Sequence, residues 1–186
     1  IINEILIQGD KFHNKKKRCI FLDAGSGSGC VGITLANERP HWKVILSDLY
    51  IEALEVAKIN LKLSNHNNIN LMCADWLTPF KQDSLDFIFS NPPYISIDDI
   101  GVENSVVSNE PSTALFSGRD GLTDIKKIIN LSKHALSSSG VLFMENGIGQ
   151  SDKITSLLEF NDFTDIRVHL DYNGVERFTS SRKHNG

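Results

Sequence analysis

The chain has 186 residues, which suits one domain with a full-sized core and is short for two. Its 40% hydrophobic and 23% charged residues are typical of a globular protein, and no apolar stretch is long enough to span a bilayer, so we expect no membrane role. The net charge of −4 argues against a general nucleic-acid binder and leaves only a local basic patch, such as residues 15–18, for that role.

The start of the chain does not resemble a signal peptide. Residues 1–7 include Glu4 and lack the charge pattern of a signal peptide, and the sequence does not begin with Met. We interpret residues 1–18 as a remnant of a linker or helix from a longer chain, and residues 19–186 as one domain.

The three cysteines have no metal-ligand spacing and favour a reducing, cytoplasmic setting. The six histidines are also scattered, so no metal site is expected.

Short apolar runs alternate with helical patterns, which favours an α/β sandwich with a mainly parallel sheet. Strands are predicted at residues 19–24, 43–48, 69–74, 85–90, 141–145, 165–170 and 176–181. The third and fourth are apolar enough to be buried on both faces. Helices are predicted at residues 30–37, 52–63, 122–135 and 150–160. Residues 95–119 lack periodicity, residues 137–140 end a helix, and Asn173-Gly174 predicts an antiparallel hairpin at the end of the sheet.

A glycine-rich loop, Gly25-Ser26-Gly27-Ser28-Gly29, follows the first strand and opens a helix. Glycines let the backbone approach a ligand closely, and the N–H groups of the helix point toward it. Asp48 ends the second strand roughly 20 residues later, where a carboxylate can accept hydrogen bonds from both ribose hydroxyls of an adenosine. We therefore expect a ligand that contains a nucleoside. Gly27, Gly29 and Gly32 also match the dinucleotide fingerprint, so a nicotinamide dehydrogenase is an alternative.

Two further polar segments follow predicted strands. Asp75-Trp76, after the third, offers a carboxylate for the adenine amino group and an indole for its face. Asn91-Pro92-Pro93-Tyr94 follows the fourth. Its prolines fix φ and remove two backbone donors, which leaves carbonyl oxygens and the Asn91 amide oxygen as acceptors for an NH2 group, while Tyr94 offers a flat surface. This pattern indicates methyl transfer to a planar nitrogen.

All these segments lie at the carboxyl ends of strands and should meet at one edge of the sheet, where open α/β folds bind ligands. A dehydrogenase needs room for a second nucleotide and has no need for an Asn-Pro-Pro-Tyr segment beside the first. S-adenosylmethionine needs one nucleoside site and a target nitrogen next to its sulfonium. The convergence therefore favours S-adenosylmethionine as the cofactor.

In order and spacing, these segments resemble the class I S-adenosylmethionine-dependent methyltransferases, and within them the release-factor glutamine N5-methyltransferases. The shared motifs are residues 21–29, 47–48, 74–76 and 90–95. More selective for this branch are residues 110–115, 120–122, 144–147 and 171–177. The resemblance covers residues 19–181, and the helical amino-terminal domain usual in the family is not matched, so we expect a catalytic-domain fragment.

The resemblance implies a class I methyltransferase (Rossmann-like) three-layer sandwich over residues 19–186, with a mainly parallel seven-stranded sheet and an antiparallel carboxy-terminal hairpin. It implies methylation of the N5 amide nitrogen of a glutamine in a peptide chain release factor. The cofactor would be bound by Gly25 to Gly29, Asp48, Asp75, Trp76 and Asn91. The substrate would be bound by Asn91, Pro92, Pro93 and Tyr94, of which Asn91, Pro92 and Tyr94 would be catalytic.

On this hypothesis the glutamine NH2 group donates hydrogen bonds to the Asn91 side-chain oxygen and the Pro92 carbonyl, and Tyr94 packs on the amide plane. Glu110 and Glu145 are interpreted as structural. The Asn-Pro-Pro-Tyr sequence is shared with enzymes that methylate adenines, so an adenine N6-methyltransferase acting on RNA or DNA is the alternative activity. A non-catalytic cofactor-binding module is a further alternative, because a fold does not fix a function.

Overall fold

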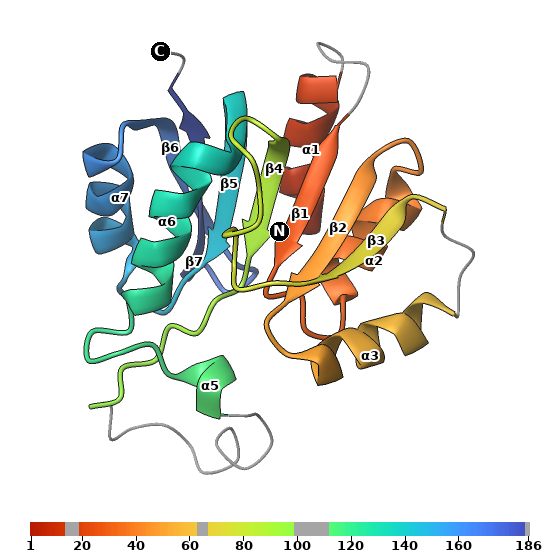
Figure 1. The fold of residues 1–186 in the computed structure, drawn as a ribbon. Coiled ribbons are helices and arrows are strands. Elements are labelled where there is room, and N and C mark those ends of the chain that lie inside the picture. Colours follow the sequence, from red (N-terminus) through yellow and green to blue (C-terminus); the bar gives the residue numbers. More distant parts are fainter. Residues whose placement is uncertain (14–18, 63–66, 99–111, 185–186) are drawn as a thin grey trace.

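The computed structural model describes residues 1–13, 19–62, 67–98 and 112–184 (Figure 1). Seven strands form one sheet in the order β3-β2-β1-β4-β5-β7-β6. The strands are β1 (Ile20–Ala24), β2 (Lys43–Asp48), β3 (Ile69–Cys73), β4 (Leu85–Ser90), β5 (Leu136–Glu145), β6 (Phe163–Leu170) and β7 (Glu176–Lys183). The first five are paired in parallel, and β7 lies antiparallel between β5 and β6. The mainly parallel sheet with an antiparallel carboxy-terminal hairpin is therefore confirmed.

Helices cover both faces of the sheet and complete the three layers (Figure 1). They are α1 (Ile2–His13), α2 (Cys30–Glu38), α3 (Ile51–Leu61), α5 (Ser112–Leu115), α6 (Thr123–Ala135) and α7 (Ser151–Phe160). One core joins α6 and α7 to the face that includes Leu22, and the other joins α1 and α2 to the face that includes Phe21. Adjacent residues of β1 thus enter opposite cores, as the alternation of side chains along a strand requires.

Strand β4 lies at the centre of the sheet, and all six of its residues are buried. The Phe87 ring packs against Phe21 and Phe12, with ring centroids 6.3 and 5.9 Å away. These rings are buried together in the core on one face of the sheet, and buried aromatic side chains contribute strongly to hydrophobic stabilisation. The carboxyl ends of β1 and β4 are therefore rigidly held. In Figure 1 these ends lie at the lower edge of the sheet, on the side of α3 and α5.

Two predictions about strands are wrong. The third strand is not buried on both faces, because β3 is the edge of the sheet and each of its residues is either half-buried or exposed. The strand predicted at residues 141–145 begins earlier than expected, because β5 already starts at Leu136, which pairs with Leu85, and residues 137–140 belong to this strand rather than to the end of the helix. The pairing then shifts register, and the Ser137 hydroxyl donates to the Asp86 carboxylate over 2.9 Å. This irregular start holds the serine-rich stretch against β4, which its composition did not indicate.

Residues outside the predicted domain take part in the same core. Helix α1 buries Ile5, Leu6 and Phe12 against the sheet. The boundary at residue 18 stays a prediction, and residues 14–18 lie outside the described part of the chain. Within the described ranges, no helix is both long and apolar enough to cross a membrane.

The contact between α1 and Trp42 gives the first testable prediction. A Cβ atom at Gly9 would collide with the Trp42 ring, which is fully buried and stacks on Phe21 at 6.4 Å between centroids. Alanine is favoured over glycine in a helix by about 1 kcal/mol, but overpacking a core costs about 1–3 kcal/mol. Gly9→Ala should therefore lower the free energy of unfolding in urea. Ile7→Ala, at an exposed position of the same helix, is the control with little effect, and a more stable Gly9→Ala protein would contradict this packing.

Candidate functional site

A cavity of about 720 Å³ lies at the carboxyl ends of β1, β2 and β4, a volume within the usual range of about 300–1,000 Å³ for ligand sites. It is lined by Gly25, Gly27, Asp48, Leu49, Tyr50, Glu52, Ala53, Val56, Ala74, Trp76, Asn91, Pro93, Ala114 and Asp124. Residues from all the predicted segments are therefore brought together in one cavity. Of the predicted site residues, Ser26, Ser28, Gly29, Asp75, Pro92 and Tyr94 do not line it.

The glycine loop has a backbone that other residues would adopt only with strain. Gly25, Gly27 and Gly29 have φ values of +72°, +53° and +79°. A Cβ at Gly25 would also lie 2.9 Å from the Trp76 ring, whereas at Gly27 it would meet no atom within 4 Å. The backbone N–H groups of Gly25 and Ser26 both donate to the Ser47 carbonyl over 2.9 Å. The loop is thus fixed to the end of β2, and Gly27 borders open space in the cavity.

Asp48 links this loop to the start of α3. Its two carboxylate oxygens accept hydrogen bonds from the backbone N–H groups of Gly27 (2.9 Å) and Tyr50 (3.0 Å). The side chain is buried but borders the cavity. Because each carboxylate oxygen can accept more than one hydrogen bond, Asp48 retains acceptor capacity for hydroxyl groups of a ligand.

Asp23 lies beneath the loop and was not recognised from the sequence, where it looks like part of an apolar strand. It is almost fully buried and accepts a hydrogen bond from the Gly32 backbone N–H over 2.9 Å. Burial raises the pKa of Asp23 to about 7, a rise that the Gly32 hydrogen bond opposes and the nearby Asp48 charge reinforces. A protonated carboxyl group here at mildly acidic pH avoids a second buried negative charge next to Asp48.

Asp75 and Trp76 point in different directions. The Asp75 carboxylate forms an ion pair with Lys127 of α6, with N–O distances of 2.7 and 2.8 Å, and does not line the cavity. Trp76 lines the cavity, and its indole N–H donates to Asp124 over 3.1 Å. Asp124 also accepts from the Ser117 hydroxyl over 2.7 Å and itself lines the cavity. The sequence did not identify Asp124, because an acidic residue in the first turn of a helix is an ordinary partner of the helix dipole.

The Asn91–Tyr94 segment is divided between the cavity and the core. Asn91 and Pro93 line the cavity, whereas Pro92 is buried. The Tyr94 side chain lies against Glu145 of β5 and Arg177 of β7, away from the cavity lining. Of the segments that distinguish the release-factor branch, residues 110–111 lie outside the described part of the chain, and Glu110 with them.

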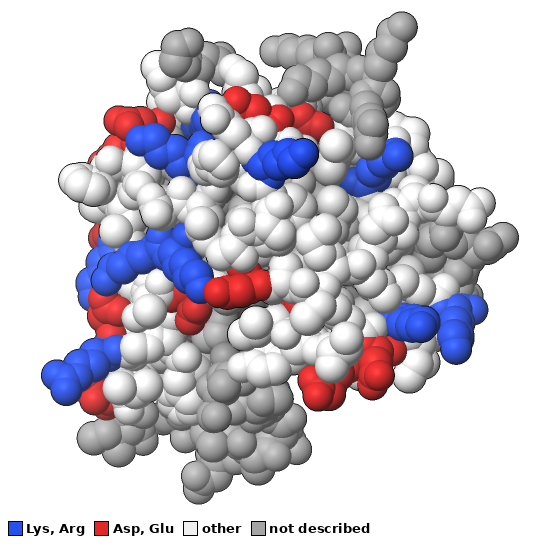
Figure 2. All heavy atoms as spheres, in the orientation of Figure 1, with Lys and Arg blue, Asp and Glu red and all other residues white. Residues whose placement is uncertain are grey.

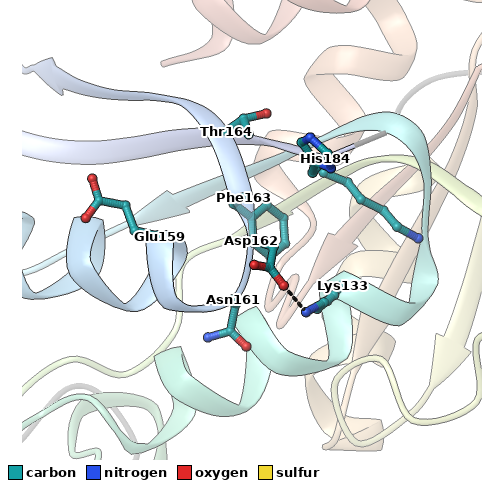
Figure 3. Close-up of a pocket in the computed structure, with 8 residues that line it drawn as sticks. Lys133, Glu159, Asn161, Asp162, Phe163, Thr164 and His184 are labelled. Atoms are coloured by element: carbon teal, nitrogen blue, oxygen red, sulfur yellow. Dashed lines mark hydrogen bonds and ion pairs between the residues drawn. The ribbon is translucent and has the colours of Figure 1, made fainter. Parts of the chain in front are cut away.

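A second cavity, of about 580 Å³, lies at the opposite edge of the sheet, where α7 ends and β6 begins (Figure 3). Figure 3 shows Lys133 pointing to Asp162, with which it forms an ion pair at 2.6 Å. None of the predicted site residues lines this cavity.

On the face in Figure 2, the described lysines and arginines lie among acidic side chains and do not form one broad basic area. The basic run at residues 15–18 lies outside the described residues.

The raised pKa of Asp23 predicts a pH dependence of stability. In the unfolded chain this carboxyl group titrates near its ordinary value of 3.8, and in the folded protein near 7. Its contribution is fully present below about pH 4 and is lost as the pH rises to about 7, because the unfolded state gives up the proton first. The melting temperature of the wild type should therefore fall relative to that of Asp23→Asn between pH 5 and 7 and then level off.

The exposed Asp152 on α7 provides the control, because Asp152→Asn should melt in parallel with the wild type over this pH range. Melting curves of Asp23→Asn and the wild type that also run in parallel would show that Asp23 does not hold its proton in the folded protein.

Comparison with known proteins agrees with this geometry. The family model described as "methyltransferase small domain" matches residues 4–109. Release factor glutamine methyltransferase from Francisella tularensis subsp. tularensis is 38% identical over 173 residues, which are 93% of this chain and 61% of that protein. The Escherichia coli protein of the same name is 32% identical over 179 residues, which are 96% of this chain and 65% of that protein. The chain thus spans less than two thirds of the length of either relative.

Solved structures share the fold at low sequence identity. The ribosomal protein L11 methylase from Lactobacillus delbrueckii subsp. bulgaricus aligns with a TM-score of 0.67 and 18% identity over 98% of this chain and 79% of that one. A methyltransferase from Pyrococcus furiosus aligns with a TM-score of 0.66 and 15% identity over 96% of this chain and 83% of that one. Because the family model spans more than half of the sequence, the chain belongs to the methyltransferase small domain family.

Proposed function

We propose that this chain is the catalytic domain of an S-adenosylmethionine-dependent N-methyltransferase that methylates the N5 amide nitrogen of a glutamine in a peptide chain release factor. The observation that carries the proposal is that one cavity is lined both by Gly27 and Asp48 and by Asn91 and Pro93. A nucleoside and a planar amide would therefore meet there. The relatives named release factor glutamine methyltransferase support this choice of substrate.

The residues present fit S-adenosylmethionine. The open space beside Gly27 allows close approach of a ligand to the loop, and Asp48 has acceptor capacity for ribose hydroxyls. The buried Ser26 hydroxyl has no hydrogen-bond partner among the described residues. Exposed apolar side chains on the same side of the cavity, Leu49 and Tyr50, provide surface for a flat base. When bound, S-adenosylmethionine supplies an electrophilic methyl group on a positively charged sulfur.

The Asn91–Tyr94 segment would hold the amide. An amide nitrogen is a weak nucleophile because its lone pair is delocalised. The side-chain oxygen of Asn91, a residue that borders the cavity, and the Pro92 carbonyl would accept hydrogen bonds from the two N–H groups, which would polarise the nitrogen and fix its direction of approach. The role of the Pro92 carbonyl stays a prediction, because Pro92 is buried and does not line the cavity. Pro93 forms the adjacent cavity wall. Stacking of Tyr94 on the amide plane stays a prediction, since the ring lies off the cavity lining in this structure. Bond formation between the amide nitrogen and the methyl carbon would break the methyl–sulfur bond, with its electron pair going to sulfur, and would leave S-adenosylhomocysteine while one amide proton is released to water.

Asp75 contacts adenine only if it exchanges its ion pair with Lys127 for the base. The three cysteines have no metal-ligand spacing, which favours the cytoplasmic location that we propose. Contact with nucleic acid is proposed only through a local basic patch.

Replacing Asp48 should weaken cofactor binding. Asp48→Asn removes the charge that strengthens the hydrogen bonds from Gly27 and Tyr50 and those expected from ribose hydroxyls. Hydrogen bonds to charged groups contribute about 1.5–3 kcal/mol, so the Kd for S-adenosylhomocysteine should rise about 10- to 100-fold. Calorimetric titration measures this, with Asp152→Asn as the exposed control. Equal affinity of Asp48→Asn and wild type would exclude Asp48 from the cofactor site.

Replacing Asn91 should reduce turnover without unfolding the protein. Asn91→Ala removes one preorganised acceptor, which costs on the order of 10²- to 10³-fold in rate. Because Asn91 is exposed, the melting temperature should change little. The measurement is the initial rate of methyl transfer to a purified release factor, with the exposed Asn130→Ala as control. A rate near that of the wild type would remove Asn91 from the mechanism.

The substrate itself is tested with radiolabelled S-adenosylmethionine. The protein is incubated separately with a release factor, with a variant of it that lacks the target glutamine, and with adenine-containing RNA or DNA. Label on the intact release factor alone is the expected result. Label on nucleic acid would assign the site to adenine methylation, and binding without transfer to any of them would favour a non-catalytic module.

A further inference from the structure

The Tyr94 hydroxyl is held by two side chains from other strands. Arg177 of β7 donates to the Tyr94 hydroxyl and to Glu145 Oε1, each over 3.1 Å, from the same guanidinium nitrogen. The Tyr94 hydroxyl lies 3.5 Å from Glu145 Oε1, and the Arg177 guanidinium carbon lies 5.5 Å from the centre of the Tyr94 ring. We call Tyr94, Glu145 and Arg177 the tyrosine cluster. It joins the segment after β4 to the antiparallel part of the sheet.

The ion pair in this cluster is more enclosed than a surface pair. The side chains of Arg177 and Glu145 are 24% and 17% exposed, whereas those of Arg167 and Asp165 on β6 are 57% and 41% exposed. Burial raises the pKa of Glu145, and the positive charge of Arg177 together with the hydrogen bond from Tyr94 opposes that rise. Enclosing both charges has a desolvation cost that an exposed pair does not have. The cluster is therefore a poor means of adding stability and a good means of fixing one geometry.

The backbone of Tyr94 is fixed as well. The Gln150 side chain donates to the Tyr94 carbonyl over 2.9 Å, and the Gln150 amide oxygen accepts from the Gly147 N–H over 2.9 Å. A Cβ at Gly121 would collide with the Tyr94 carbonyl, and one at Gly147 would lie 3.2 Å from the Tyr94 ring. Both the side chain and the carbonyl of Tyr94 are thus enclosed by segments that come later in the chain.

The other end of the segment is fixed at Ser90. This residue is paired with Ala24 in the sheet, and its hydroxyl donates to the Ala24 carbonyl over 2.8 Å. Only residues 91–93 lie between the two fixed positions, and Asn91 and Pro93 are the two that line the cavity. Loosening the Tyr94 end would therefore be transmitted to Asn91 through two prolines whose φ angles are restricted.

We propose that Glu145 and Arg177 are positioning residues that act through the Tyr94 hydroxyl to hold Asn91 and Pro93 in their places on the cavity wall. The predicted effect on the rate rests on the function proposed above, whereas the predicted effect on the position of Asn91 rests on the structure alone. Neither Glu145 nor Arg177 lines the cavity, so cofactor affinity should not depend on them.

The kinetic test uses Arg177→Met, Tyr94→Phe and the double variant, with Arg167→Met as the matched control from an exposed ion pair. Small displacements of a positioned group can cost up to about 10²-fold in rate. We expect Arg177→Met to lower kcat for the release factor by about tenfold or more with an unchanged Kd for S-adenosylhomocysteine. The double variant should lose no more than the more damaging single change, because both changes break one connection. Arg177→Lys should restore part of the rate.

A second readout does not need activity. In 15N-labelled protein, the backbone and side-chain amide signals of Asn91 should shift in Arg177→Met and Tyr94→Phe and stay in place in Arg167→Met. A kcat within twofold of wild type together with unshifted Asn91 signals would overturn the positioning role. Shifted Asn91 signals in a protein whose wild type transfers no methyl group would support the positioning role and reject the proposed function.

Discussion

The parallel pairing of β1 with β4 is the interaction on which the site depends. Ala24 pairs with Ser90, and the Ser90 hydroxyl donates to the Ala24 carbonyl. Because both strands are almost entirely buried at the centre of the sheet, their carboxyl ends have little freedom. The residues that follow them, Gly25 and Asn91, consequently open onto the same cavity. A loop suited to a nucleoside and a segment suited to an amide are thus adjacent although they are far apart in sequence.

The charged groups around the pairing of β1 with β4 have different roles. Asp48 joins the glycine loop to α3 by accepting two backbone hydrogen bonds, and it keeps its carboxylate at the cavity. Asp23 lies deeper, where burial raises its pKa to about 7. On the other side, the tyrosine cluster connects the Asn91–Tyr94 segment to β5 and β7. The antiparallel end of the sheet contributes no residue to the cavity lining. The tyrosine cluster nevertheless connects this end of the sheet to the cavity wall.

The fold and part of the cavity lining could be predicted from local patterns. Strand ends, the glycine loop and Asn91 follow from the rule that the carboxyl ends of parallel strands share one edge. Side-chain contacts between residues that are far apart in the sequence could not be predicted, because they depend on how the helices pack against the sheet. Asp75 was expected at the adenine, but its orientation depends on Lys127 of α6. Asp124 enters the cavity only because α6 packs beside Trp76. The start of β5 depends in a similar way on a register shift against β4.

A crystal structure of the protein with S-adenosylhomocysteine and a peptide containing the target glutamine would test the central claim most directly. The claim predicts the nucleoside between Gly27 and Asp48, with the glutamine amide within hydrogen-bond distance of the Asn91 side-chain oxygen and Tyr94 still in contact with Arg177. A nucleoside bound elsewhere, such as in the cavity beside Lys133, or a glutamine amide that does not reach Asn91, would contradict it.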